Sequence, residues 1–165
     1  MNELYAEAGV KRKETFGTYA LRFLLIFVAI LSFLLASLNT IMLIIGTVLI
    51  IIIVFMFPRL NVEYEYVFCD GQLDFDKIMG NAKRKTALKI DFEQVEIMAP
   101  LGSHELDAYS QGNIIIKDFT SKRKEAKPYA IIYKNADKKL KILFEPNEKM
   151  LSCIKVKNPR KLIQY

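Results

Sequence analysis

The sequence predicts a two-helix transmembrane hairpin followed by an α+β, mainly β domain that ends in one helix. Three observations indicate this fold class. The 35 residues Phe23–Phe57 carry no charged side chain. Beyond them, short segments alternate apolar and polar residues with a period of two and are separated by turn residues. After Pro146 the apolar spacing changes to that of a helix.

The apolar run is too long for one membrane span. A bilayer core about 30 Å thick needs about 20 apolar residues, whereas 35 residues in one helix would rise about 52 Å. The stretch Ser37–Thr40 is the least committed to a helix, so we expect spans at about residues 19–38 and 40–57. A signal peptide has a shorter apolar core, and a buried hairpin of a soluble protein usually has a polar face, which this run lacks.

Charge at the flanks predicts the orientation. Lys11, Arg12, Lys13 and Arg22 precede the first span and Arg59 follows the second, whereas the connecting turn has no cation. Because Lys and Arg stay in the cytoplasm, we expect a two-span protein of the cell membrane with both termini cytoplasmic. The spans contain no ionisable residue after Arg22, which argues against a channel or transporter.

The predicted domains are a cytoplasmic N-terminal segment at residues 1–18, the hairpin at 19–57 and a cytoplasmic domain at 62–165. The N-terminal segment has two interpretations. It is either an amphipathic helix whose basic triplet contacts anionic lipid, or a partly ordered tail whose charges set the topology. The net charge of the chain is +6. Cys69 and Cys153 match no metal or redox spacing, so we expect both in the core and no cofactor or metal.

The cytoplasmic domain is predicted from alternation and turn signals. Val62–Phe68 alternates apolar residues with glutamates, and Asp70-Gly71 and Gly80-Asn81 are turn signals. The seven expected strands are Val62–Phe68, Gln72–Met79, Ala82–Ile90, Asp91–Ala99, Ile114–Phe119, Pro128–Lys134 and Lys139–Phe144. Residues 100–113 form a predicted loop and residues 135–138 a turn.

The last element is a predicted helix. Pro146 suits its first position, Met150, Leu151 and Ile154 form one apolar stripe, and Pro159 ends it.

Seven antiparallel strands closed by a C-terminal helix, after a membrane hairpin, resemble the bacterial pleckstrin-homology-like (PH-like) proteins. The segments Y-E-Y-V-F-C-D-G-Q-L and K-I-L-F-E-P-N-E-K-M-L carry this resemblance. It implies a PH-like barrel or sandwich. More narrowly, the segments I-M-A-P-L-G-S-H-E-L and K-D-F-T-S resemble an uncharacterised family of short two-span membrane proteins from clostridial and related Gram-positive bacteria. That resemblance covers nearly the whole chain and implies no activity.

Basic clusters are the candidate contacts with anionic lipid. They are the N-terminal triplet Lys11, Arg12 and Lys13, the group Lys83, Arg84 and Lys85, and the group Lys122, Arg123 and Lys124, with further cations at Lys127, Lys138, Lys139 and Lys141. Each cluster can equally be a solvated turn or strand end. PH-type lipid binders often gather cations at the first hairpin, but this chain has acidic residues there, at Asp70, Asp74 and Asp76.

The single histidine, His104, lies in the predicted loop beside Ser103 and Glu105. Neighbours in sequence do not make a catalytic triad, so we expect a solvated or capping histidine, with a pH sensor as the alternative. No nucleic-acid motif is present. We therefore expect a membrane-anchored, non-enzymatic scaffold or regulatory module that binds another membrane protein, with the lipid bilayer as its other partner. The alternative is a module that senses anionic lipid through the basic clusters. A homo-oligomer stays open.

Overall fold

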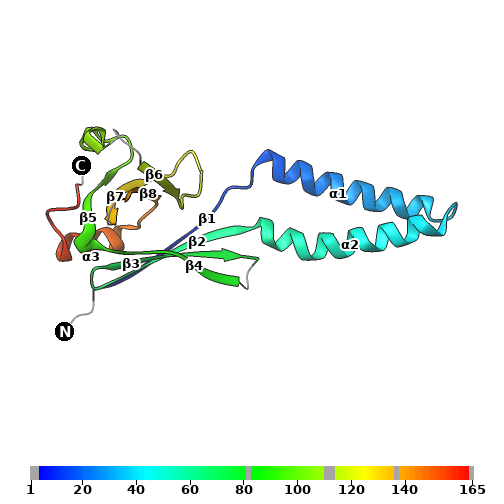
Figure 1. Cartoon of the computed structure of the whole chain (residues 1–165), viewed down its shortest axis with the longest axis horizontal. Helices are drawn as coiled ribbons and strands as arrows, with labels where there is room; N and C mark the ends of the chain where they lie inside the picture. The colour runs from blue at the N-terminus through cyan, green and yellow to red at the C-terminus, as the bar shows by residue number, and fades with distance from the viewer. Residues whose placement is uncertain (1–3, 81–82, 110–113, 136–137, 164–165) are drawn as a thin grey trace. The chain divides into compact units, whose positions relative to one another are not determined.

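The computed structural model describes residues 4–80, 83–109, 114–135 and 138–163. Their elements are β1 (Tyr5–Lys11), α1 (Phe16–Leu35), α2 (Thr40–Leu60), β2 (Val62–Cys69), β3 (Gln72–Met79), β4 (Lys83–Asp91), η1 (Phe92–Gln94), β5 (Val95–Pro100), η2 (His104–Tyr109), β6 (Ile114–Asp118), β7 (Tyr129–Asn135), β8 (Lys138–Phe144) and α3 (Glu148–Lys157) (Figure 1). The chain forms two compact units. The hairpin unit is Lys13–Val62 with Met79–Lys83, and the β-rich unit is Met1–Arg12, Glu63–Ile78 and Arg84–Tyr165.

The hairpin unit contains two antiparallel helices, each long and apolar enough to cross a membrane. Asn39 ends the turn between them, because its side chain accepts a hydrogen bond from the Ile41 N–H and caps α2. Small residues form the contact between the helices: Gly46 is buried, and the Phe33 ring lies 3.0 Å from where its Cβ would be. Gly46 thus packs against α1 of its own hairpin.

The first sheet of the β-rich unit has the strand order β1-β2-β3-β4. β1 corrects the interpretation of the N-terminal segment as a helix or a tail. Tyr5–Lys11 is a strand that pairs antiparallel with β2 over its whole length, from Tyr5 opposite Cys69 to Lys11 opposite Glu63. The N-terminal segment therefore contributes to the same unit as the residues after the hairpin.

The second sheet has the order β5-β7-β8-β6, and the described residues thus form eight strands rather than seven. The expectation of an all-antiparallel domain was also wrong, because β6 pairs parallel with β8. The physical reason is the connection at residues 119–128. This connection is long enough to carry the chain from β6, at one edge of the sheet, past the position of β8 to β7. β7 then pairs antiparallel with β5 on one side and with β8 on the other, which leaves β8 parallel to β6.

Aromatic side chains from both sheets fill the core. Tyr66 on β2 and Phe75 on β3 meet Phe144 on β8 edge to face, with ring centroids 5.4 and 5.6 Å from that of Phe144. The largest fully buried side chains are Tyr66, Phe68, Phe75, Phe92, Phe144, Leu73, Ile90, Met98, Ile131, Ile132, Ile142 and Met150. The period-two alternation of β2 therefore sets which face of the first sheet is buried.

α3 buries Met150 and Ile154, as its apolar stripe predicts. Its start differs by two positions, because Asn147 is the N-cap and accepts from the Met150 N–H, so the helix begins at Glu148 and Pro146 precedes the cap. After α3 the chain covers the edge of β5, where Met98 donates to the Lys161 carbonyl and accepts from the Ile163 N–H.

Three other expectations changed. Cys69 is exposed at the end of β2, so its expected place in the core was wrong, whereas Cys153 is partly buried. The predicted fourth strand begins later, since Phe92–Gln94 form a 3₁₀ turn, and the predicted loop contains η2. The expected turn at Asn81, the strand start at Ala82, the loop end at 110–113 and the centre of the 135–138 turn lie outside the described residues.

Candidate functional site

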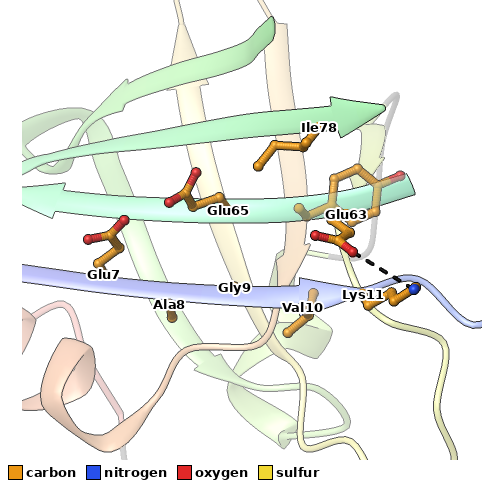
Figure 2. A pocket seen from close by; sticks show the side chains of 9 residues that line it. Glu7, Ala8, Gly9, Val10, Lys11, Glu63, Glu65 and Ile78 are labelled. Atoms are coloured by element: carbon orange, nitrogen blue, oxygen red, sulfur yellow. Dashed lines mark ion pairs between the residues drawn. The ribbon is translucent and has the colours of Figure 1, made fainter. Parts of the chain in front are cut away.

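A groove lies on the outer face of β1, β2 and β3. Alternation along β1 buries Ala6 and leaves Glu7, Gly9 and Lys11 on the face away from the core. The register then places Gly9 opposite Glu65 and Lys11 opposite Glu63. Figure 2 shows the Glu7 and Glu65 carboxylates beside each other on neighbouring strands, with Ile78 of β3 beyond them.

Gly9 is the reason for the hollow. A Cβ at Gly9 would meet only the Tyr64 carbonyl oxygen, at an ordinary contact distance of 3.6 Å, so a side chain would project into free space. Without one, the outer face is hollowed over about 440 Å³. The residues that line the groove are Glu7, Ala8, Gly9, Val10, Lys11, Glu63, Tyr64, Glu65 and Ile78.

Hydrogen bonds tie the carboxylates of the groove together. The Tyr5 hydroxyl donates to Glu7 Oε2 at 2.8 Å. A hydrogen bond between the two carboxyl groups is the main reason that the pKa of Glu65 is raised and that of Glu7 lowered, with burial adding to the rise at Glu65. Of the two carboxyl groups, Glu65 therefore holds a proton more tightly than Glu7. Arg84 Nη2 lies 3.1 Å from Glu65 Oε2 on the far side of the pair.

This arrangement favours a cationic ligand. The groove has three carboxylates and one ammonium group, and that ammonium, Lys11 Nζ, lies 4.0 Å from Glu63 Oε1. Carboxylates bind ammonium and guanidinium groups through charge-assisted hydrogen bonds. In the part of the chain that the structure describes, no three His, Cys, Asp or Glu side chains are placed to hold a metal ion. The chemistry of the carboxylates thus matches an amine or a guanidinium group.

The predicted lipid contacts lie on separate elements. The first group, Lys83, Arg84 and Lys85, begins β4, and the group Lys122, Arg123 and Lys124 follows β6. Lys11 ends β1 and Arg12 follows it, whereas Lys13 and Lys83 belong to the hairpin unit.

Three of the nine predicted lipid contacts already have acidic partners. Lys11 faces Glu63. Arg84 Nε donates to Asp76 Oδ2 at 2.6 Å, and Lys122 pairs with Asp118. Among the described residues, the other six are exposed and form no ion pair with a neighbour: Arg12, Lys13, Lys83, Lys85, Arg123 and Lys124.

His104 is fully exposed at the start of η2, where its Nδ1 lies 3.3 Å from Asp107 Oδ2. This position agrees with a solvated histidine. The sequence did not predict the groove. Its signal was the alternation in Y-A-E-A-G-V-K, where alanines take the core positions and Glu7, Gly9 and Lys11 the outer ones, but the segment was interpreted as an amphipathic helix or a tail.

Comparison with known proteins gives one result. No curated protein and no solved structure shows significant similarity to the chain. One family model matches residues 2–164, and it describes a bacterial PH-like domain with both the N-terminal strand and the hairpin inside the match. The chain therefore belongs to the Bacterial PH-like domain (DUF6106) family.

Proposed function

We propose that this protein is a membrane-anchored, non-enzymatic interaction module whose groove on β1–β3 binds a basic segment of another membrane protein at the cytoplasmic face. PH-like domains are in general non-enzymatic binding modules. The observation that carries the proposal is the carboxylate-lined hollow over Gly9.

The chain order supports two spans with both ends on one side. β1 precedes the helices and β2 follows them, yet the two strands are hydrogen-bonded neighbours. A strand pair cannot form across a bilayer, so the residues before Phe16 and after Leu60 share one side of the membrane. The basic residues at those ends favour the cytoplasmic side.

The same order limits the length of chain between the second span and the groove. Glu63, which lines the groove, is the third residue after the end of α2, and three extended residues span about 10 Å. Juxtamembrane segments on the cytoplasmic side of membrane proteins are rich in Lys and Arg. A carboxylate-lined groove in the domain that follows the spans is therefore complementary in charge to such segments.

The groove suits protein better than lipid. Anionic headgroups repel carboxylates, and the surface potential of the inner leaflet is negative. The alternative function, anionic-lipid sensing through the basic clusters, depends on the six cations that have no carboxylate partner, since Lys11, Arg84 and Lys122 already have one. These six are Arg12, Lys13, Lys83, Lys85, Arg123 and Lys124. No specific observation gathers them around one ligand.

Site-specific photo-crosslinking of the full-length protein in its native membranes tests the proposal. A photoreactive residue replaces Ile78 in the groove, and a control replaces Ile116, which is 62% exposed on β6. We expect a protein adduct from position 78 alone. Its crosslinked peptide should contain Lys or Arg next to a membrane span.

Two variants make the test specific. Gly9→Val fills the hollow without a clash and should abolish the adduct while the domain stays folded, because valine also favours strands. Glu93→Gln removes an exposed carboxylate outside the groove and should leave the adduct unchanged. A lipid adduct in place of a protein adduct would favour the lipid-sensing alternative. An adduct that survives Gly9→Val would refute the groove as the binding site.

A further inference from the structure

A second hollow lies along the hairpin, and we infer that it binds one anionic phospholipid. One acyl chain would lie in an apolar groove between α1 and α2, and its phosphate would lie at Arg22. This inference is independent of the peptide groove and rests on the helices spanning a bilayer.

The apolar part measures about 410 Å³. Ala29 is small and buried, and the other lining residues are larger, so the helices form an open groove at this position. Its lining residues are Ile26, Ala29, Ile30, Phe33, Leu34, Ile50 and Ile53. At the end of the groove nearer the interhelical turn, the Phe33 ring lines the groove and packs against Gly46.

A separate polar hollow of about 430 Å³ is lined by Arg22, Phe57, Pro58, Asn61 and Gly80. Ile26 lies one helical turn beyond Arg22, and Ile53 one turn before Phe57, so both hollows follow the same stripes of the two helices. The Arg22 guanidinium lies 5.6 Å from the Phe57 ring centroid, which connects the stripes at this point.

Arg22 is held in place but retains donor capacity. Its Nη1 atom donates to Glu14 at 3.0 Å and its Nη2 atom to Asn61 Oδ1 at 2.8 Å. Its Nε atom is buried and has no hydrogen-bond partner among the described residues. A buried donor normally has a partner, and a phosphate oxygen is a strong acceptor for a guanidinium.

The length of the groove fits one acyl chain. From Arg22 to Phe33 the helix rises about 16 Å, which is close to half of a bilayer core about 30 Å thick. The lining continues to Leu34, next to the last residue of α1. An extended acyl chain of one leaflet therefore matches the groove in length.

Charge favours an anionic headgroup. The hairpin unit contains four cations, Lys13, Arg22, Arg59 and Lys83, and a single acidic residue, Glu14. Each cation near the surface favours anionic lipid by about fivefold in affinity. A zwitterionic lipid would gain no such preference.

The test uses the full-length protein in nanodiscs that contain equal amounts of phosphatidylglycerol and phosphatidylcholine. Native mass spectrometry after release measures which lipid stays bound. We expect one phosphatidylglycerol per chain, retained at least about fivefold over phosphatidylcholine. Ile30→Trp should fill the groove and abolish retention. Leu31→Trp, at an exposed apolar position that does not line the groove, is the matched control and should leave retention unchanged.

Arg22→Gln should remove the preference for phosphatidylglycerol, and Arg22→Lys should keep most of it. Equal retention of the two lipids by the wild type, or equal loss in both tryptophan variants, would overturn the inference. A dimer that Ile30→Trp disrupts would overturn it in favour of a second copy in the groove. The peptide adduct at position 78 is expected to survive Ile30→Trp, so the two proposals fail separately.

Discussion

Replacing Ala6 by aspartate tests the pairing of β1 with β2. Ala6 is completely buried and lies opposite Phe68, which is also completely buried. A carboxyl group at this position would enter the aromatic core and lose its hydration. Burial of such a group without a good partner costs about 3 kcal/mol. With a urea dependence of about 2 kcal/mol per molar, the midpoint of unfolding should fall by about 1.5 M.

The assay is urea unfolding of the full-length protein in nanodiscs, followed by the near-ultraviolet circular dichroism of tyrosine, since the chain has no tryptophan. Hydrogen exchange in residues 62–69 reports β2 directly, and exchange there should accelerate. Ala87→Asp is the matched control, because Ala87 is exposed on β4 at the other edge of the same sheet. Its midpoint should change by no more than about 0.5 M. Equal shifts in the two variants would refute the buried pairing of β1.

Three further predictions concern single positions. Gly80 has φ +61°, and an added Cβ would lie 2.8 Å from the Pro58 side chain and 2.9 Å from its backbone. Gly80→Ala should therefore destabilise the turn between β3 and β4 by about 2 kcal/mol. Hydrogen exchange in β3 measures this effect and should become faster. The buried Tyr66 hydroxyl donates to the Phe119 carbonyl, so Tyr66→Phe should lower the free energy of unfolding by about 1–2 kcal/mol in urea titrations; no change would mean that water replaces the hydroxyl. The pKa of Glu65 is raised in the folded state, so folding binds an extra proton there, and the stability should fall as the pH rises from about 4.5 through the raised pKa. In thermal unfolding, Glu65→Gln should show a weaker fall of stability with pH. Parallel curves of stability against pH for the two proteins would contradict the raised pKa.

Elements with strong local patterns were predicted well. The uncharged run and the break at Asn39 gave both helices within about three residues at each end, because a bilayer leaves little choice of structure for such a run. The alternation of Val62–Phe68 likewise gave β2 and its buried face. The stripe of α3 was correct, although the helix begins at Glu148, after the Asn147 cap, rather than at Pro146.

Long-range pairing was decided by the tertiary structure alone. β1 is separated from β2 by the whole hairpin, and its alanines favour a helix as much as a strand, so only the aromatic face of β2 and the backbone hydrogen bonds select the strand. The parallel pairing of β6 with β8 has the same origin, since neighbours in sequence are not neighbours in that sheet.

The sequence by itself determined the membrane hairpin, the β-rich nature of the rest and the positions of its charges, because each depends on local composition and periodicity. The tertiary structure decided which charges meet. It paired Arg84 and Lys122 with carboxylates and brought Glu7 next to Glu65 across 58 positions of the chain. The candidate groove arises from that register, and a register between distant strands is fixed by packing across the whole sheet rather than by either strand alone.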